Sequence, residues 1–123
     1  MGKAHSIATA VVPMLFGAPV EIERRVIVDV EEKLAKDAAK NYGFSEYSTN
    51  WREVVERPDI DIVDICTPND THAAIAIAAA KAGKHVMCEK PMAMSVAEAE
   101  EMLAAAKKTG VVTMVSYNYR HTP

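Results

Sequence analysis

One lysine stands where it could transfer a proton. Lys90 lies in the tripeptide Glu89-Lys90-Pro91, directly after the short apolar run His85–Cys88. An amine that is desolvated, or that lies beside another positive charge, is driven towards its neutral form and can then take a proton from a substrate hydroxyl. Taken alone, however, Lys90 is better explained as a solvated lysine paired with a nearby acid. The choice between these two roles of Lys90 depends on the elements around it.

A second polar stretch, TPNDTH at residues 67–72, follows another apolar run. Pro68 fixes one backbone angle and Asn69 can hydrogen-bond locally, so a defined turn is expected there whatever the function. His72 by itself is more typical of a residue that packs at the start of a helix than of an acid–base catalyst.

Two apolar runs and the helix pattern between them position both polar stretches. Residues 61–66 and His85–Cys88 are bounded by Pro and Gly, and the alanine-rich residues 73–82 lie between them. This pattern is typical of two buried parallel strands joined by a crossover helix. The carboxyl ends of parallel strands lie at one edge of the sheet, where open α/β sheets bind ligands. We therefore expect residues 67–72 and Lys90 to meet at that edge.

Periodicity and capping residues predict the other elements. We expect Leu34, Ala38 and Tyr42 to face inward on one helix, and Ala99, Leu103 and Ala106 on the last. Asn50, and Ser95 with Glu98, should cap helices. The predicted helices are residues 7–16, with a kink or early stop at Pro13, 31–42, 51–56 and 96–108, and the predicted strands are Val26–Val28, Glu46–Ser48 and 111–115.

Several motifs together resemble one family. TPNDTH, AGKH, EKP and YNYR follow one another in an order and at spacings similar to the nucleotide-binding half of the Gfo/Idh/MocA oxidoreductases, the glucose-fructose oxidoreductase and inositol dehydrogenase family. The likeness spans nearly the whole chain. Family members are similar in build, with an NAD(P)-binding Rossmann domain followed by a substrate domain on an open antiparallel sheet. The resemblance implies an α/β fold with a doubly wound parallel sheet.

The beginning of the chain departs from the family's pattern. A first strand and a G-x-G-x-x-G turn would precede K-x-H, so Gly2 in the opening MGKAH would be the third glycine. The resemblance implies that the first strand and two glycines are missing, which leaves the phosphate cradle incomplete. A truncated or misassigned reading frame would explain this. We expect residues 1–120 to be a partial NAD(P)-binding domain and 121–123 the start of an absent substrate domain.

The missing strand would be central in the sheet order 3-2-1-4-5-6, between Val26–Val28 and the strand at 61–66. Its neighbours could close up and pair at about 4.8 Å, or stay apart with a slot one strand wide. We expect the slot, because closure would misalign helix layers that pack on the complete sheet.

The resemblance also implies roles for single residues. Asp29, at the tip of its strand, would bind the adenosine ribose hydroxyls and repel a 2′-phosphate, which favours NAD over NADP. From spacing alone, Asp29 is equally well the N-cap of the next helix, with Glu32 completing a capping box. The residues that would contact the cofactor are Gly2, Asp29, Thr67, Pro68, Asn69, His72, Glu89, Lys90 and Asn118.

Lys90 becomes the expected catalytic residue in this context, and a cis peptide before Pro91 would aim its side chain. Arg120 could bind an anionic group or bridge to the second domain. The resemblance implies a fragment of an NAD-dependent oxidoreductase that moves hydride between nicotinamide and a sugar or cyclitol hydroxyl. We expect it to be inactive alone, because in family members an Asp and a His from the second domain usually complete the site. The parent would be a homo-oligomer.

Two other functions remain open. A non-catalytic nucleotide-binding or interaction module needs Asp29 and the loop at 67–72, but not Lys90. An α/β domain of another class, such as an S-adenosylmethionine enzyme, uses the same sheet edge, but its chemistry has no role for the Glu-Lys-Pro tripeptide.

Composition is that of an ordinary globular domain, with 123 residues, 50% of them hydrophobic and 25% charged. The net charge of −3 gives no reason to expect a nucleic acid or a membrane as partner. Without a signal-peptide pattern, we expect a cytoplasmic protein. Cys66 and Cys88 are then expected as buried thiols, with no metal site.

Overall fold

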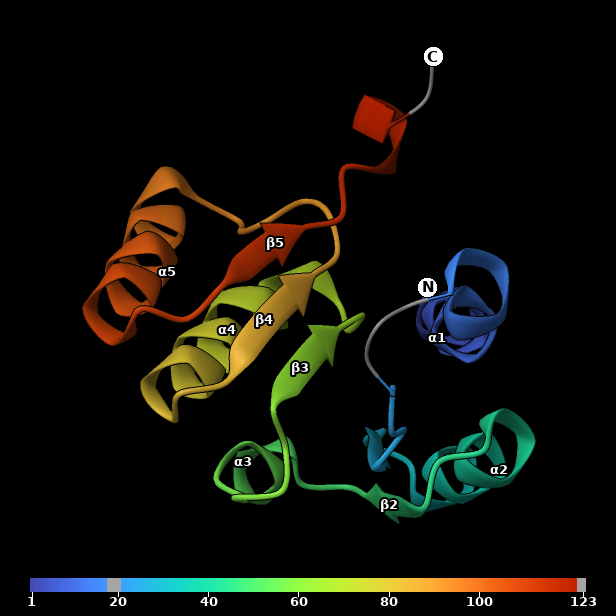
Figure 1. Cartoon of the computed structure of the whole chain (residues 1–123). Coiled ribbons are helices and arrows are strands. Elements are labelled where there is room, and N and C mark those ends of the chain that lie inside the picture. Colours follow the sequence, from blue (N-terminus) through green and yellow to red (C-terminus); the bar gives the residue numbers. More distant parts are fainter. Residues whose placement is uncertain (18–20, 122–123) are drawn as a thin grey trace. The chain divides into compact units, whose positions relative to one another are not determined.

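The computed structural model describes residues 1–17 and 21–121, so residues 122–123 of the expected substrate domain lie outside the described part (Figure 1). Two compact units, residues 1–54 and 55–123, make up the chain. The helices are α1 Gly2–Phe16, α2 Glu32–Tyr42, α3 Trp51–Val55, α4 His72–Lys81 and α5 Val96–Thr109. The strands are β1 Val26–Val28, β2 Glu46–Ser48, β3 Ile62–Ile65, β4 His85–Cys88 and β5 Thr113–Val115, and 3-10 turns lie at Asn69–Thr71 and Asn118–His121.

In the first unit α1 is longer than predicted. It begins at Gly2 instead of residue 7, and Pro13 lies inside the helix without ending it. A proline inside a helix removes one backbone hydrogen bond but does not always break the helix. The helix ends where Gly17 takes a left-handed conformation, with φ of 55°.

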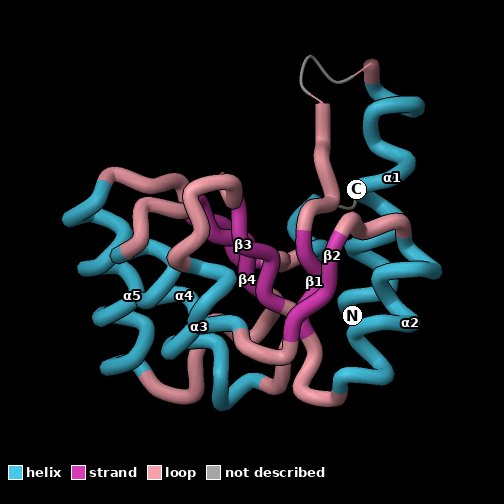
Figure 2. The backbone as a smooth tube through the Cα atoms, turned by 90° about the horizontal axis from the view of Figure 1, so that it is seen from below, coloured by secondary structure: helices cyan, strands magenta, loops and turns pink. Residues whose placement is uncertain are grey.

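The strands β1 and β2 pair in parallel, and α2 packs on both of them (Figure 2). The predicted inward face of α2 is wrong at Leu34, which is 49% exposed, because Ala35 and Ala39 take the buried positions. Ala38 and Tyr42 are half-buried. Small alanine side chains let the helix approach the strands closely. Leu34 therefore lies beside the contact face instead of in it.

In the second unit β3, β4 and β5 form a parallel sheet in that order, with Ile65 opposite Cys88 and Cys88 opposite Val115. The helix α4 packs against β3 and β4, and α5 packs against α4 (Figure 1). The predicted strand, crossover helix and strand are confirmed. Alanines make the close helix packing possible, and the buried apolar residues of these elements are Ile65, Ala73, Ile75, Ala76, Ala79, Ala80, Val86, Cys88, Met102, Ala105 and Ala106.

The first turn of α5 confirms the predicted cap in part. The backbone N of Glu98 donates to Ser95 Oγ over 3.2 Å, but the Glu98 carboxylate accepts from Met94 N over 2.8 Å instead of returning to the N-cap. Ala106 is buried as predicted. Leu103 is not, since it is 49% exposed and Met102 takes the inward position.

The ladders each lie within one unit, since β1 pairs with β2, and β3 pairs with β4. The slot expected between β1 and β3 stays a prediction. In the two described ranges, no helix combines the length and the apolar character that crossing a membrane would need.

Candidate functional site

The carboxyl ends of β3, β4 and β5 bring the predicted groups of the second unit to one edge of the sheet. Lys90, just beyond β4, is exposed there. It shares an open hollow of about 290 Å³ with Tyr117, Asn118, Tyr119 and Arg120, which follow β5. Small-molecule sites usually measure about 300–1,000 Å³, so this hollow lies at the lower end of that range.

The loop after β3 is closed by its own hydroxyl groups. Thr71 donates from its backbone N and from Oγ1 to the carbonyl oxygen of Pro68, over 3.0 and 2.7 Å. The Thr71 proton is thereby used, so Thr67 Oγ1 is the donor in the 2.6 Å contact with Thr71 Oγ1. Asn69 begins the 3-10 turn with an exposed side chain. The loop is therefore a hydrogen-bonded turn, and the side-chain amide of Asn69 faces solvent.

His72 joins this loop to the next one. Its side chain is 0% exposed. Nε2 lies 2.9 Å from the carbonyl oxygen of Thr67, and Nδ1 lies 2.9 Å from that of Pro91. Its backbone N donates to Asn69. Cofactor contact by His72 stays a prediction, and its ring nitrogens already have partners within the chain.

The tripeptide at 89–91 takes the conformation that the resemblance implies. The Lys90–Pro91 peptide bond is cis. Glu89 is 5% exposed, and its Oε2 accepts from the backbone N of Lys90 over 3.0 Å. The carboxylate of Glu89 thus holds the main chain of Lys90, while the Lys90 ammonium extends to the exposed side.

In the first unit Asp29 directly follows β1, and Gly2 is the first residue of α1. The alternative role of Asp29 as helix N-cap is wrong, because the N-cap of α2 is Glu31. Asp29 Oδ1 instead accepts from the backbone N of Glu31 over 3.1 Å, and Asp29 N donates to the carbonyl oxygen of Ser48 over 3.2 Å. These bonds fix a half-buried carboxylate at the tip of the strand.

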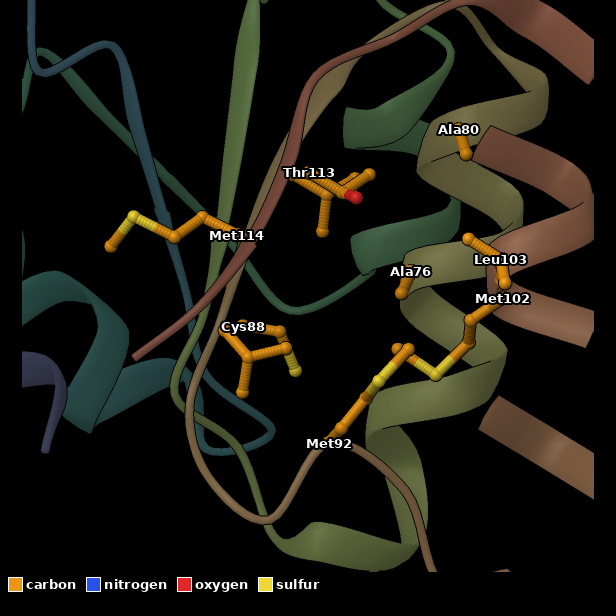
Figure 3. Close-up of a pocket in the computed structure, with 10 residues that line it drawn as sticks. Ala76, Ala80, Cys88, Met92, Met102, Leu103, Thr113 and Met114 are labelled. Carbon is orange, nitrogen blue, oxygen red and sulfur yellow. The ribbon is translucent and has the colours of Figure 1, made fainter. Parts of the chain in front are cut away.

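A second cavity, of about 50 Å³, lies between the sheet and the helices α4 and α5 (Figure 3). Met92 and Met102 extend towards each other in it, beside Cys88, whereas the side chain of Met114 points the other way. A space this small with an apolar lining belongs to the packing of the core. The candidate site is the larger hollow.

The two cysteines are free thiols, with Cys88 buried as predicted and Cys66 only half-buried. Burial, then the charge of Asp64 and a 3.7 Å hydrogen bond to Asp64 Oδ1, raise the pKa of Cys66 to about 12. Burial, then the charges of Glu89 and Asp64, raise the pKa of Cys88 to about 11. Both are therefore poor nucleophiles near neutral pH.

Sequence reasoning missed two kinds of residue. Tyr117 and Tyr119 line the hollow on either side of Asn118, and their position just beyond a strand was the signal. Lys84, in the AGKH motif, is buried and donates from Nζ to the carbonyl oxygen of Arg57 over 2.6 Å. A lysine between a helix and a buried strand gave little sign of that role. Trp51 is half-buried, and the Arg52 guanidinium lies 4.3 Å from the centroid of its ring.

Comparison with known proteins gives a consistent picture. A family described as an oxidoreductase family with an NAD-binding Rossmann fold, Gfo/Idh/MocA, matches residues 6–117. Levoglucosan dehydrogenase of Pseudarthrobacter phenanthrenivorans is 50% identical over 100% of the chain and 32% of the relative. Myo-inositol 2-dehydrogenase of Thermotoga maritima is 34% identical over 76% of the chain and 28% of the relative.

Comparison with solved structures gives the same family of proteins. The structure of levoglucosan dehydrogenase in complex with NADH and levoglucosan superimposes with a TM-score of 0.93 and 49% identity, over 98% of this chain and 33% of that one. The chain thus spans about a third of the length of the relatives it matches.

Proposed function

The chain belongs to the Gfo/Idh/MocA oxidoreductase family, and from this premise we propose that it is the dinucleotide-binding domain of an NAD-dependent dehydrogenase of sugars or cyclitols. The domain would end near residue 120, with a substrate domain after it. The observation that carries the proposal is the hollow in which Lys90 meets Asn118 at the carboxyl edge of three parallel strands. Ligands of open α/β sheets bind at this edge.

The described residues fit such a cofactor. The carboxylate of Asp29 is held beyond the end of β1, where it can accept hydrogen bonds from ribose hydroxyls and repel a 2′-phosphate. In the second unit the hydrogen-bonded turn at 67–72 offers Asn69, and Asn118 lies in the hollow. Bound NAD would supply the hydride acceptor, and the chain's own residues would orient it.

Lys90 would move the proton. Its ammonium is exposed in the hollow, so the desolvation that favours a neutral amine has to come from the bound molecules. The neutral amine would take the proton of the substrate hydroxyl as that carbon is oxidised. Tyr117 and Tyr119 would give a sugar ring an aromatic wall in the same hollow.

Titration of the chain with NAD, NADP and S-adenosylmethionine, followed by calorimetry, tests the proposal. NAD should bind more tightly than NADP, and S-adenosylmethionine should not compete with it. Asp29→Asn should narrow the difference between NAD and NADP, because it removes the charge that faces the 2′-phosphate. Asp37→Asn, on the exposed side of α2, is the matched control and should leave that difference unchanged. Tighter binding of S-adenosylmethionine than of NAD would contradict the proposal.

A further inference from the structure

His72 is a polar side chain in a place that an apolar one could fill. It is among the largest fully buried side chains of the chain, with Ile65 and Cys88. Burying an imidazole is unfavourable unless its nitrogen atoms are hydrogen-bonded. Both nitrogens do have partners, and each partner is a main-chain carbonyl in a loop that leaves a strand at the ligand edge. The ring therefore links two loops instead of filling the centre of the core.

The partners of His72 differ in where they lie along the chain. Thr67 follows β3 and opens the loop at 67–72, whereas Pro91 follows β4 and Lys90. Carbonyl oxygens only accept hydrogen bonds, so a neutral imidazole can donate to one of them at a time and an imidazolium to both. A neutral ring therefore holds one of the two loops by a hydrogen bond and only contacts the other, whereas an imidazolium bonds both carbonyl oxygens over 2.9 Å.

Lys90 is consequently fixed on both sides. Glu89 Oε2 accepts from its backbone N over 3.0 Å, and His72 Nδ1 lies 2.9 Å from the carbonyl oxygen of Pro91, the residue after it. The side chain between these anchors is exposed in the hollow. The rate of a reaction rises when neighbouring residues orient the catalytic group before the substrate binds.

We infer that His72 is a positioning residue, which holds the main chain beneath Lys90 in register with the loop at 67–72. This rests on the proposed function, in which Lys90 carries the proton. Both ring nitrogens of His72 lie against main-chain carbonyl oxygens of its own chain. Its effect passes through Pro91 to Lys90, so its loss should lower kcat while leaving the affinity for NAD in place.

Two near-isosteric variants separate its two bonds. In a full-length relative with the same TPN, AGKH and EKP motifs and a histidine at this position, His72→Gln places an amide nitrogen near Nε2 and keeps the Thr67 side. His72→Asn places one near Nδ1 and keeps the Pro91 side. We expect His72→Gln to lose about 10- to 100-fold in kcat, the cost of a misplaced catalytic group, with an unchanged Kd for NAD. His72→Asn should lose much less.

The control is His85→Gln, at the other end of β4. His85 Nδ1 accepts from Val112 N over 3.0 Å, so this variant also removes a histidine hydrogen bond. It should lower Tm without a selective loss of kcat. Equal losses of kcat in His72→Gln and His72→Asn, tracking their losses in Tm, would overturn the inference.

A double-mutant cycle with Lys90→Ala completes the test. If His72 acts through Lys90, then His72→Gln costs nothing further once Lys90 is Ala. Additive losses would overturn the positioning role while leaving the proposed function standing. A Lys90→Ala variant with full kcat would instead overturn the proposed proton transfer, and with it the role of His72.

NMR of the unaltered 123-residue chain keeps the inference testable if a variant does not fold. A ring N–H proton of His72 that exchanges slowly with solvent and shows an Overhauser contact to Pro91 would support it. A ring whose N–H protons exchange freely would overturn it.

Discussion

The Nζ atom of Lys84 donates a hydrogen bond of 2.6 Å to the carbonyl oxygen of Arg57. Lys84 is only 8% exposed, so its charge lies largely out of water, and the carbonyl oxygen of Arg57 accepts a hydrogen bond from it. The bond ties the start of β4 to the segment that leads into β3. The lysine of the AGKH motif thus serves the sheet that carries the candidate site.

Replacing Lys84 by Met should destabilise the chain, because the alkyl stem is kept but the bond to Arg57 is lost. Hydrogen bonds that involve a charged group contribute about 1.5–3 kcal/mol, which is the loss we expect in the free energy of unfolding. Urea denaturation would measure it. Lys84→Arg, which retains a donor and the charge, should lose less, and equal losses in the two variants would contradict the role of the hydrogen bond.

The thiols should make the stability fall at high pH. Burial, assisted by Asp64, raises the pKa of Cys66 from 9.0 to about 12, and burial with Glu89 raises that of Cys88 from 9.0 to about 11. The folded state therefore keeps protons that the unfolded state loses above pH 9. This contribution is complete below pH 9 and is lost as the pH rises towards 11 and 12.

Unfolding of the chain at pH values from 8 to 10.5 would check this. As the pH rises, the free energy of unfolding should fall more steeply for the unaltered chain than for a variant with both Cys66 and Cys88 changed to Ala. Parallel curves would mean that neither thiol is protected by the fold. Alkylation at pH 8 should likewise be slow until denaturant is added.

In a full-length relative with the same Glu-Lys-Pro tripeptide, Lys90→Ala should lower kcat by about 10²- to 10⁴-fold, the range of general acid–base catalysis. Binding of NAD should be retained, since the loop at 67–72 and Glu89 are untouched. Steady-state kinetics and NAD titration would separate the two effects. Equal losses in binding and rate would make Lys90 a cofactor clamp.

The 123-residue chain by itself should show no dehydrogenase turnover on any polyol. Its hollow presents Lys90, two tyrosines, Asn118 and Arg120 on an open surface, and the enclosing walls that exclude water would come from a substrate domain. Absorbance of NADH with inositol and sugar substrates is the measurement. NADH formed by the purified chain would show that these residues suffice.

Local sequence determined the strands and their direction. The apolar runs that became β3 and β4, with an alanine-rich segment between them, left a parallel pair as the natural solution, and the pair placed Lys90 and residues 67–72 at one edge. The cap at Ser95 was also readable, because capping depends on residues within one turn. The order and spacing of the motifs also indicated the family.

Which face of a helix turns inward was decided only by the tertiary structure. Leu34 and Leu103 were predicted to be inside, yet each is 49% exposed, while Ala35 and Met102 are buried. Periodicity predicts how wide the apolar stripe of a helix is. Close packing against the neighbouring element decides how the helix is rotated about its axis, and here the buried position is shifted by one residue from the predicted one. Alanines permit that close approach.

The environment of single polar residues was likewise a tertiary outcome. From spacing, Lys84 and Lys90 are both lysines beside a strand, yet one is buried against a carbonyl and the other is exposed in the hollow. His72 was expected as a cofactor contact, and its ring lies between Thr67 and Pro91. The sequence determined which residues reach the ligand edge, because two strands joined by a crossover helix run in parallel and end at the same edge of the sheet. Their partners come from segments up to 27 residues away, so only the folded chain decided them.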